Sequence, residues 1–285
     1  MKGIGITTDC VCDLPEDYLK ANDIELMYFY ITTDSGKFRD GYVITSDNIL
    51  EYLEQGGTQA ETHAPSTQEY KDFFERHLDQ YDELIHIAIS GQVGVSCYHA
   101  MEARRLMGAR GQRVTVVDSQ NLSTGMGYLV MKAAELRDNG QSAAEITEEL
   151  IRTRGNVSTT FITRNADYLS RNGKVSKWIG SLGAFLMIHP VLALKKGRIS
   201  LQMIRIGNYE RSVIRYVRGV LKHSGRIANT RLFITHAGCT VKMIAQIRAE
   251  VDRLCPFAEI IVTQTSATVS SNCGPGTVGV MFIHK

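Results

Sequence analysis

The chain has 285 residues, 44% of them hydrophobic, and its 32 basic and 30 acidic residues leave a net charge of +2. This length and hydrophobic content are enough for one large domain or two ordinary ones, and the balanced charge argues against a nucleic-acid-binding protein. No segment approaches the roughly 18 consecutive apolar residues that span a membrane. Met1–Asp9 becomes polar too soon for a signal peptide, so we expect a cytoplasmic protein.

Strand and helix patterns alternate along the first half of the chain. Short apolar or β-branched runs predict strands at 3–8, 24–32, 83–89 and 113–117. Apolar residues at helical spacing predict helices at 47–54, 67–78, 96–106, 127–137 and 143–154. Asp13 and Glu16 indicate one more helix start, with Asp13 as its capping residue. This βαβ alternation favours an open, mostly parallel sheet flanked by helices.

The pattern changes near Asn156, where hairpins begin to mix with helices. Strands are predicted at 157–163, 188–194, 199–206, 231–235, 258–263 and 277–283. Helical segments are predicted at 166–170, 211–221 and 241–253. We therefore predict an α/β fold of two domains, a 1–156 unit with a mostly parallel sheet and a 157–285 unit with an α+β mixed sheet. A ligand cleft is expected between them, because pockets favour domain interfaces.

Small hydroxyl residues and glycines gather in five stretches that follow or border predicted strands. They are Thr7–Asp9, Thr62–Ser66, Ser90–Ser96, Asp118–Ser119 and Ser271–Thr277. In open parallel sheets the ligand binds beyond the carboxyl ends of the strands, where three of these stretches are expected. Hydroxyls and backbone N–H groups there predict a site that holds a small polar or anionic group.

The cysteines and two acidic residues have simpler interpretations than a metal or catalytic centre. The six cysteines are scattered and lack the spacing of a zinc site, so we interpret them as reduced thiols and predict no metal or other cofactor. Asp9 and Asp118 stand at strand ends, where paired carboxylates suit acid–base chemistry or Mg²⁺. Buried carboxylates that accept hydrogen bonds from backbone N–H groups explain them more simply.

The order and spacing of the motifs resemble the DegV family, the lipid-binding proteins that include the fatty-acid-binding subunit of bacterial fatty acid kinases. The matching segments are 7–15 (TDSxxDLP in the family), 62–66 (TSQPS), 89–96 (ISSxLSGT), 117–119 with Gly125 and Gly127 (VDS…GxG), 169–176 (LxxGGRIS) and 271–276 (HTGPG). Together these six motifs extend over essentially the whole chain.

The resemblance implies a binding protein and not an enzyme. It implies a long-chain fatty acid in an apolar tunnel between the domains, with the carboxylate held by loop hydroxyls and presented to a separate kinase catalytic subunit. The corresponding ligand-binding positions are Thr62, His63, Ser66, Ser90, Ser96, Lys174, Asn272, Cys273 and Gly274. Candidates for the tunnel lining are Phe161, Leu182, Phe185, Leu186, Met187 and Ile188.

The chain departs from the family pattern at polar positions of these motifs. Asn272 and Cys273 replace the histidine and threonine of HTGPG, and Lys174 replaces the arginine of GGRIS. Gly91 and Gly94 stand where the family has serines. An apolar cavity survives such changes, whereas delivery to a kinase depends on the head-group geometry that they alter.

Each hydroxyl also has a structural interpretation. Thr62 and Ser66 are candidate carboxylate ligands, but Ser66 is equally suited to cap the helix that follows it. Ser90 and Ser96 border a helix N-terminus, where they either bind an anionic head group or cap the helix.

The remaining candidates leave two other classes of protein open. Asn272 is either a head-group donor or a turn residue, and Lys174 either faces the ligand or lies in solvent. A neutral lipid head group would suit the loss of histidine and arginine. An enzyme that acts on a small carboxylate or phosphate would use Cys273 or His63.

Overall fold

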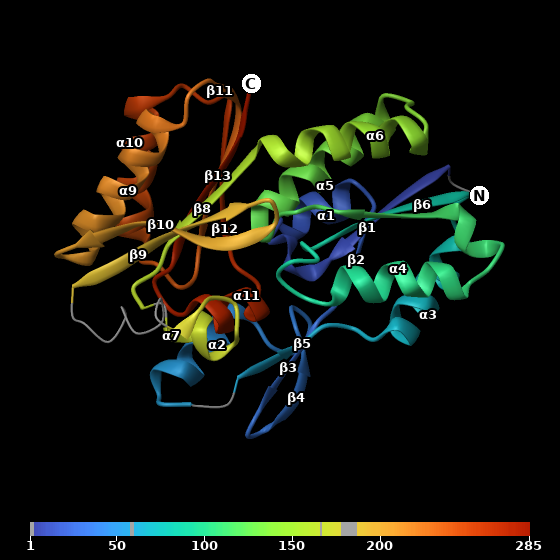
Figure 1. Ribbon diagram of the computed structural model, residues 1–285, viewed down its shortest axis with the longest axis horizontal. Coiled ribbons are helices and arrows are strands. Elements are labelled where there is room, and N and C mark those ends of the chain that lie inside the picture. Colours follow the sequence, from blue (N-terminus) through green and yellow to red (C-terminus); the bar gives the residue numbers. More distant parts are fainter. Residues whose placement is uncertain (1–2, 58–59, 166, 178–186) are drawn as a thin grey trace.

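Strands from the two halves of the chain form separate sheets in the computed structural model, which describes residues 3–57, 60–165, 167–177 and 187–285 (Figure 1). Within these residues, no helix is long and apolar enough to cross a membrane. The division into domains at 156/157 remains a prediction.

The first sheet is parallel, as predicted, with the strand order β2-β1-β6-β7. Its strands are β1 (Ile4–Asp9), β2 (Ile24–Met27), β6 (Glu83–Ala88) and β7 (Val114–Asp118). Helices α1 (Glu16–Ala21), α5 (Ser123–Asp138) and α6 (Ala143–Thr153) share one apolar core with this sheet. Helices α3 (Thr67–Leu78) and α4 (Ser96–Leu106) share another with its second face. Burial on both faces explains why β1 and β6 are buried along nearly their whole length.

The second sheet is mixed, with the order β10-β9-β8-β13-β11-β12. Its strands are β8 (Val157–Ile162), β9 (Ile188–Lys195), β10 (Arg198–Ile206), β11 (Ile227–His236), β12 (Glu259–Gln264) and β13 (Val278–His284). Helices α9 (Tyr209–His223) and α10 (Val241–Leu254) cover one face and lie side by side at one end of the molecule (Figure 1). Helix α5 contacts β8, β11 and β13 as well as β1 and β6, so it packs against both sheets.

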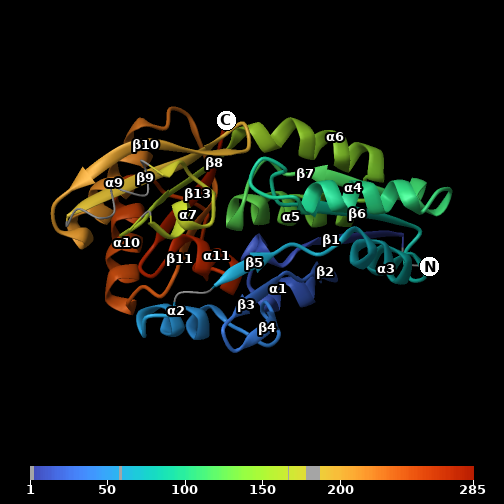
Figure 2. The same cartoon turned by 60° about the horizontal axis from the view of Figure 1, so that its bottom comes forward.

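A small antiparallel sheet, β4-β3-β5, completes the described structure. It contains β3 (Tyr30–Thr33), β4 (Gly36–Arg39) and β5 (Glu61–His63). Helices α2 (Ser46–Glu54) and α11 (Ala267–Cys273) lie beside it (Figure 2), and α7 (Asp167–Arg171) contacts α11. Three short 3-10 turns, η1 (Cys10–Cys12), η2 (Arg110–Arg113) and η3 (Arg154–Asn156), connect longer elements.

Two sequence predictions about these elements were wrong, and three short elements were not predicted. The single strand at 24–32 is two strands, because the chain leaves the parallel sheet after Met27 and joins the small sheet at Tyr30. Strands β4 and β5 and helix α11 were not predicted, since they are short and rich in residues typical of loops. Asp13 has a left-handed backbone (φ 53°) and does not cap α1, whose side-chain cap is absent.

Candidate ligand-binding cavity

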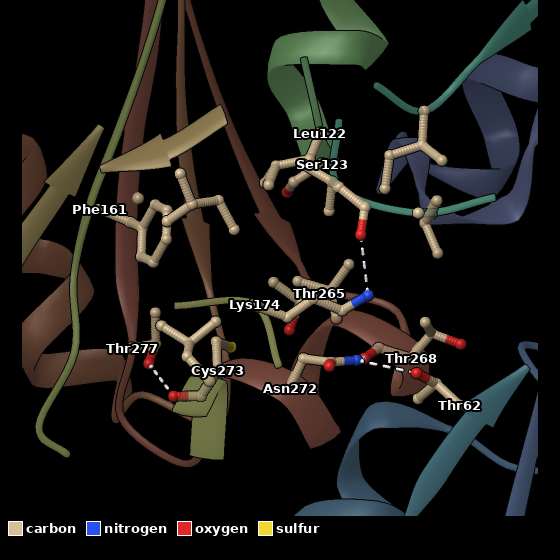
Figure 3. A pocket seen from close by; sticks show the side chains of 18 of the residues that line it. Thr62, Leu122, Ser123, Phe161, Lys174, Thr265, Thr268, Asn272, Cys273 and Thr277 are labelled. Atoms are coloured by element: carbon tan, nitrogen blue, oxygen red, sulfur yellow. Dashed lines mark hydrogen bonds between the residues drawn. The ribbon is translucent and has the colours of Figure 1, made fainter. Parts of the chain in front are cut away.

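A cavity of about 370 Å³ lies where the two large sheets meet α11 (Figure 3). This volume falls within the range of about 300–1,000 Å³ that is typical of small-molecule sites. Most of its lining side chains are apolar, and a few polar groups interrupt them. The cavity is therefore suited to a ligand that is largely hydrocarbon.

One wall is formed by the loops that follow the parallel strands. Val11 follows β1, Ile89 follows β6, and Leu122 and Ser123 stand beyond β7. These positions are the carboxyl ends of the strands, where the sequence predicted a site. The side chains that reach the cavity from these ends are mainly aliphatic, so this wall favours an apolar part of a ligand.

The opposite wall comes from alternate residues of the mixed sheet. Along β13, Val280 and Phe282 face α9 and α10, whereas Gly279 and Met281 face the cavity. Successive side chains of a strand point to opposite faces, and Phe161 of β8 reaches the cavity for the same reason. A Cβ at Gly279 would lie 2.7 Å from Cε of Met281, so glycine keeps this wall open.

Helix α11 forms the third wall, and two buried carboxylates hold its N-terminus. Asp13 accepts a hydrogen bond from the Ser266 N–H (2.7 Å), and Asp40 accepts from the N–H groups of Ala267 (3.0 Å) and Thr268 (2.9 Å). Burial raises the pKa of Asp13 to about 7 and also raises the pKa of Asp40. These contacts fix a short, hydroxyl-rich segment as a helix, because the carboxylates satisfy N–H groups that would otherwise be unpaired.

Polar groups line the cavity from β5, α11 and the segment after α7, and also at Ser123, Thr235, Thr265 and Thr277 (Figure 3). Asn272 Nδ2 donates to the Thr268 carbonyl (2.7 Å) and to Thr62 Oγ1 (3.2 Å). Lys174 Nζ donates to the Val93 carbonyl (2.9 Å), and burial lowers the pKa of this lysine. Among the described residues, Lys174 is the one lysine, arginine or carboxylate of the lining.

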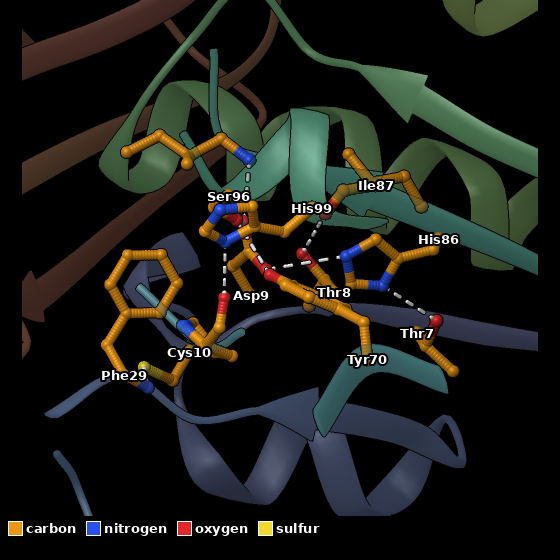
Figure 4. A network of polar contacts seen from close by, with 12 residues as sticks. Thr7, Thr8, Asp9, Cys10, Phe29, Tyr70, His86, Ile87, Ser96 and His99 are labelled. Carbon is orange, nitrogen blue, oxygen red and sulfur yellow. Dashed lines mark hydrogen bonds and ion pairs between the residues drawn. The ribbon is translucent and has the colours of Figure 1, made fainter. Parts of the chain in front are cut away.

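A buried network centred on Asp9 holds the loop that carries Ile89 (Figure 4). One carboxylate oxygen accepts from the Ile89 N–H (2.9 Å) and from the Ser96 hydroxyl (2.8 Å), and the other accepts from the Tyr70 hydroxyl. His86 Nε2 lies 3.4 Å from the same carboxylate. Asp9 thus connects β1, α3 and α4 behind the cavity wall, in agreement with its interpretation as a carboxylate that binds backbone N–H groups.

The structure brings four of the nine predicted ligand-binding residues into the lining: Thr62, Lys174, Asn272 and Cys273. They come from positions far apart in the chain, and α11 and β5 carry three of them. Their role toward a ligand remains a prediction.

The three predicted serines make other contacts and are not part of the lining. Ser66 caps α3 through reciprocal hydrogen bonds with Glu69, which was its structural interpretation. Ser90 donates to the Gly197 carbonyl (2.8 Å), and Ser96 donates to Asp9. Ser90 and Ser96 therefore stabilise segments that border the cavity, and Ser66 stabilises α3.

His63 and Gly274 also lie outside the lining. His63 is exposed because side chains alternate along β5 and its neighbour Thr62 points inward. Gly274 ends α11 with φ 77°, and a Cβ there would lie 2.3 Å from the Tyr168 ring. Its role in the structure is to allow this turn against Tyr168.

Some of the cysteine and tunnel candidates line the cavity, and others do not. Burial raises the pKa of the Cys273 thiol to about 12, which disfavours the thiolate that a nucleophile needs. Phe161 lines the cavity, whereas Met187 is exposed and Ile188 lies in β9 outside the lining. The other candidates, Leu182, Phe185 and Leu186, lie outside the described residues.

Sequence reasoning missed most of the apolar lining. The missed residues include Val11, Phe29, Ile89, Val93, Leu122, Leu169, Ile199, Val269 and Met281. An apolar residue placed directly after a parallel strand was an available signal for Ile89, because such positions meet at the ligand-binding edge of the sheet. No local sequence pattern indicated that Phe29 and Val269 would line the same cavity.

The sequence matches one family model over residues 3–285, that of the family described as "Uncharacterised protein, DegV family". A DegV domain-containing protein of Deinococcus radiodurans is 28% identical over 285 residues, which cover 97% of each chain.

Solved structures of DegV family proteins are also similar to this chain. A structure described as "Fatty Acid Binding of a DegV family Protein from Thermus thermophilus" has a TM-score of 0.87, 28% identity and complete coverage of both chains. DegV from Bacillus subtilis, described as a fatty acid binding protein, has a TM-score of 0.85 at 20% identity, again with complete coverage of both chains. At that identity the second similarity shows the fold alone.

Proposed function

Because this chain belongs to the DegV family, we propose that it binds one long-chain fatty acid in the cavity between its two large sheets. The observation that carries the proposal is a largely apolar cavity with one cation in its described lining. The description of the Thermus thermophilus relative as fatty-acid-binding supports it.

The acyl chain supplies most of the affinity in this proposal. Each CH₂ group removed from water contributes roughly 0.8 kcal/mol, so an acyl chain has far more to gain from the cavity than a small carboxylate. Aliphatic residues after the parallel strands and Phe161 of the mixed sheet would enclose it. The tunnel that the family resemblance implies follows this apolar path.

In this proposal, Thr62 and Lys174 bind the carboxylate. Thr62 Oγ1 already accepts from Asn272, so its own proton is free to donate to the ligand. Lys174 Nζ uses one of its three protons on the Val93 carbonyl. A charge-assisted bond from this ammonium fixes the polar end and offsets part of the cost of burying the charge.

A binding role agrees better with this lining than a catalytic one. The ionisable groups among the described lining residues are Lys174 and Cys273, and the Cys273 thiol has a pKa of about 12. Presentation of the carboxylate to a separate fatty acid kinase subunit belongs to the proposal through the family resemblance. Its test is a pull-down of the loaded protein with such a subunit, followed by addition of ATP and detection of acyl phosphate and ADP.

Native mass spectrometry of the purified protein, followed by lipid extraction, tests the binding proposal. We expect a mass increase that corresponds to about one fatty acid per chain, and the extracted lipid identifies the chain length. A ligand-free mass that does not change on addition of saturated or unsaturated fatty acids would refute the proposal.

A further inference from the structure

The side chain of Asn272 has an unused hydrogen-bond acceptor. Asn272 is 8% exposed and lines the cavity, and its Oδ1 has no partner among the described residues. A buried polar atom without a partner costs about 1–3 kcal/mol, so native structures rarely leave one without a reason.

The orientation of the amide is determined by its other bonds. Nδ2 lies 2.7 Å from the Thr268 carbonyl, which can only accept a hydrogen bond. Rotation of the amide by 180° would place Oδ1 against this carbonyl, where both atoms are acceptors. Oδ1 is therefore the atom that still requires a donor, and because almost none of its surface is accessible, a ligand donor meets it only when the side chain shifts toward the cavity.

The neighbouring groups require a hydrogen-bond acceptor from the ligand, not a donor. Thr62 has a hydroxyl proton to donate, and Lys174 has ammonium protons that favour an anion. An ionised carboxylate satisfies Thr62 and Lys174, but it is acceptor-only and cannot pair with Asn272 Oδ1. A plain fatty acid anion consequently leaves one polar group of the cavity unsatisfied.

We propose that Asn272 selects single-chain lipids whose polar end carries a hydrogen-bond donor beside the acceptor that Thr62 and Lys174 bind. This inference rests on the proposed function and names the ligand class of the same cavity. The donor is either a hydroxyl close to the carboxylate, as in a hydroxylated fatty acid, or the proton of the carboxylic acid itself. Both sources present an O–H group to Asn272 Oδ1.

Isothermal titration calorimetry with three ligands distinguishes these sources. At about pH 8, where the carboxylic acid is ionised, we expect 2-hydroxy- or 3-hydroxyhexadecanoic acid to bind about fivefold or more tightly than hexadecanoic acid. If the acid proton is the donor, hexadecanoic acid binds more tightly as the pH falls toward 5. Lys174 also titrates. Only the part of the pH dependence that Asn272→Leu abolishes is therefore assigned to Asn272.

Two variants show whether Asn272 is responsible. Asn272→Leu removes the acceptor and should bring the affinity ratio between the hydroxylated and plain acids to about one. Ser66→Ala lies outside the lining and leaves the carbonyl that orients Asn272, so the ratio should persist. The hydroxyl comparison in the unaltered protein needs no variant and remains decisive if Asn272→Leu does not fold.

The inference would be overturned if neither hydroxyl increased affinity and the pH dependence were the same with and without Asn272. Binding of plain hexadecanoic acid in that experiment would leave the proposed function standing. Failure of all three ligands to bind would overturn both, so the two failures are distinguishable.

Discussion

Replacement of Lys174 by methionine tests whether the buried cation holds a carboxylate. Methionine keeps most of the side-chain length and apolar stem, but it removes the ammonium that donates to the Val93 carbonyl at 2.9 Å. A hydrogen bond to a charged group contributes about 1.5–3 kcal/mol. We therefore expect hexadecanoic acid to bind roughly 10- to 150-fold more weakly to Lys174→Met at neutral pH.

The assay is calorimetry with hexadecanoic acid and with hexadecanol, which has no charge. Hexadecanol affinity should change by less than about threefold, because an alcohol gains little from the ammonium. Lys195→Met is the matched control, since Lys195 is exposed and lies outside the lining. Equal losses for the acid and the alcohol, or no loss for the acid, would refute the reasoning.

The pH dependence provides an independent measurement. Burial lowers the pKa of Lys174 from its usual value of 10.5, so the ligand-free ammonium loses its proton earlier than an exposed lysine. Affinity for hexadecanoic acid should fall as the pH rises through this lowered pKa, and Lys174→Met should lack that step. A step of the same size in both proteins would assign the titration to another group.

Three further predictions concern Asp13, Ser66 and Cys273. Because the pKa of Asp13 rises from 3.8 to about 7 on folding, the neutral form is favoured in the folded state and the free energy of unfolding should fall as pH rises across that interval. Urea unfolding at about pH 5 and 8 should show a smaller difference in Asp13→Asn, and an unchanged difference would contradict this assignment. Ser66→Ala should lower the free energy of unfolding by about 1 kcal/mol, because it removes the α3 cap, and should leave fatty acid affinity unaltered. A loss of affinity without a loss of stability would instead indicate that Ser66 binds the ligand. Thiol labelling of the native protein at about pH 8 should leave Cys273 among the slowest sites, given its pKa of about 12, and rapid labelling there would favour the enzyme alternative.

Local sequence patterns were sufficient for most elements of the fold. Helices α3 and α4 begin and end where their apolar spacing predicted, at Thr67–Leu78 and Ser96–Leu106. The parallel sheet followed from alternating apolar runs and helices, since such runs are stable only when covered on both faces. Its carboxyl edge also indicated the side on which the cavity lies.

Short elements could not be predicted, because distant partners stabilise them. Helix α11 has the sequence ATVSSNC, in which most residues have little intrinsic preference for a helix. Its N–H groups are paired by Asp13 and Asp40, which are more than 200 residues away in the sequence. Strand β5 likewise exists through its pairing with β3.

The sequence by itself determined the family resemblance, the parallel sheet and the presence of Thr62, Lys174 and Asn272 in the ligand-loop motifs. Only the tertiary structure decided which polar groups face the cavity, because that depends on strand alternation at His63 and on competing hydrogen-bond partners for Ser90 and Ser96. Within the described part of the chain, it also left the Asn272 acceptor without a partner. A motif specifies residue types. The direction of a side chain and its hydrogen-bond partners depend on residues that are close in space and often distant in the sequence.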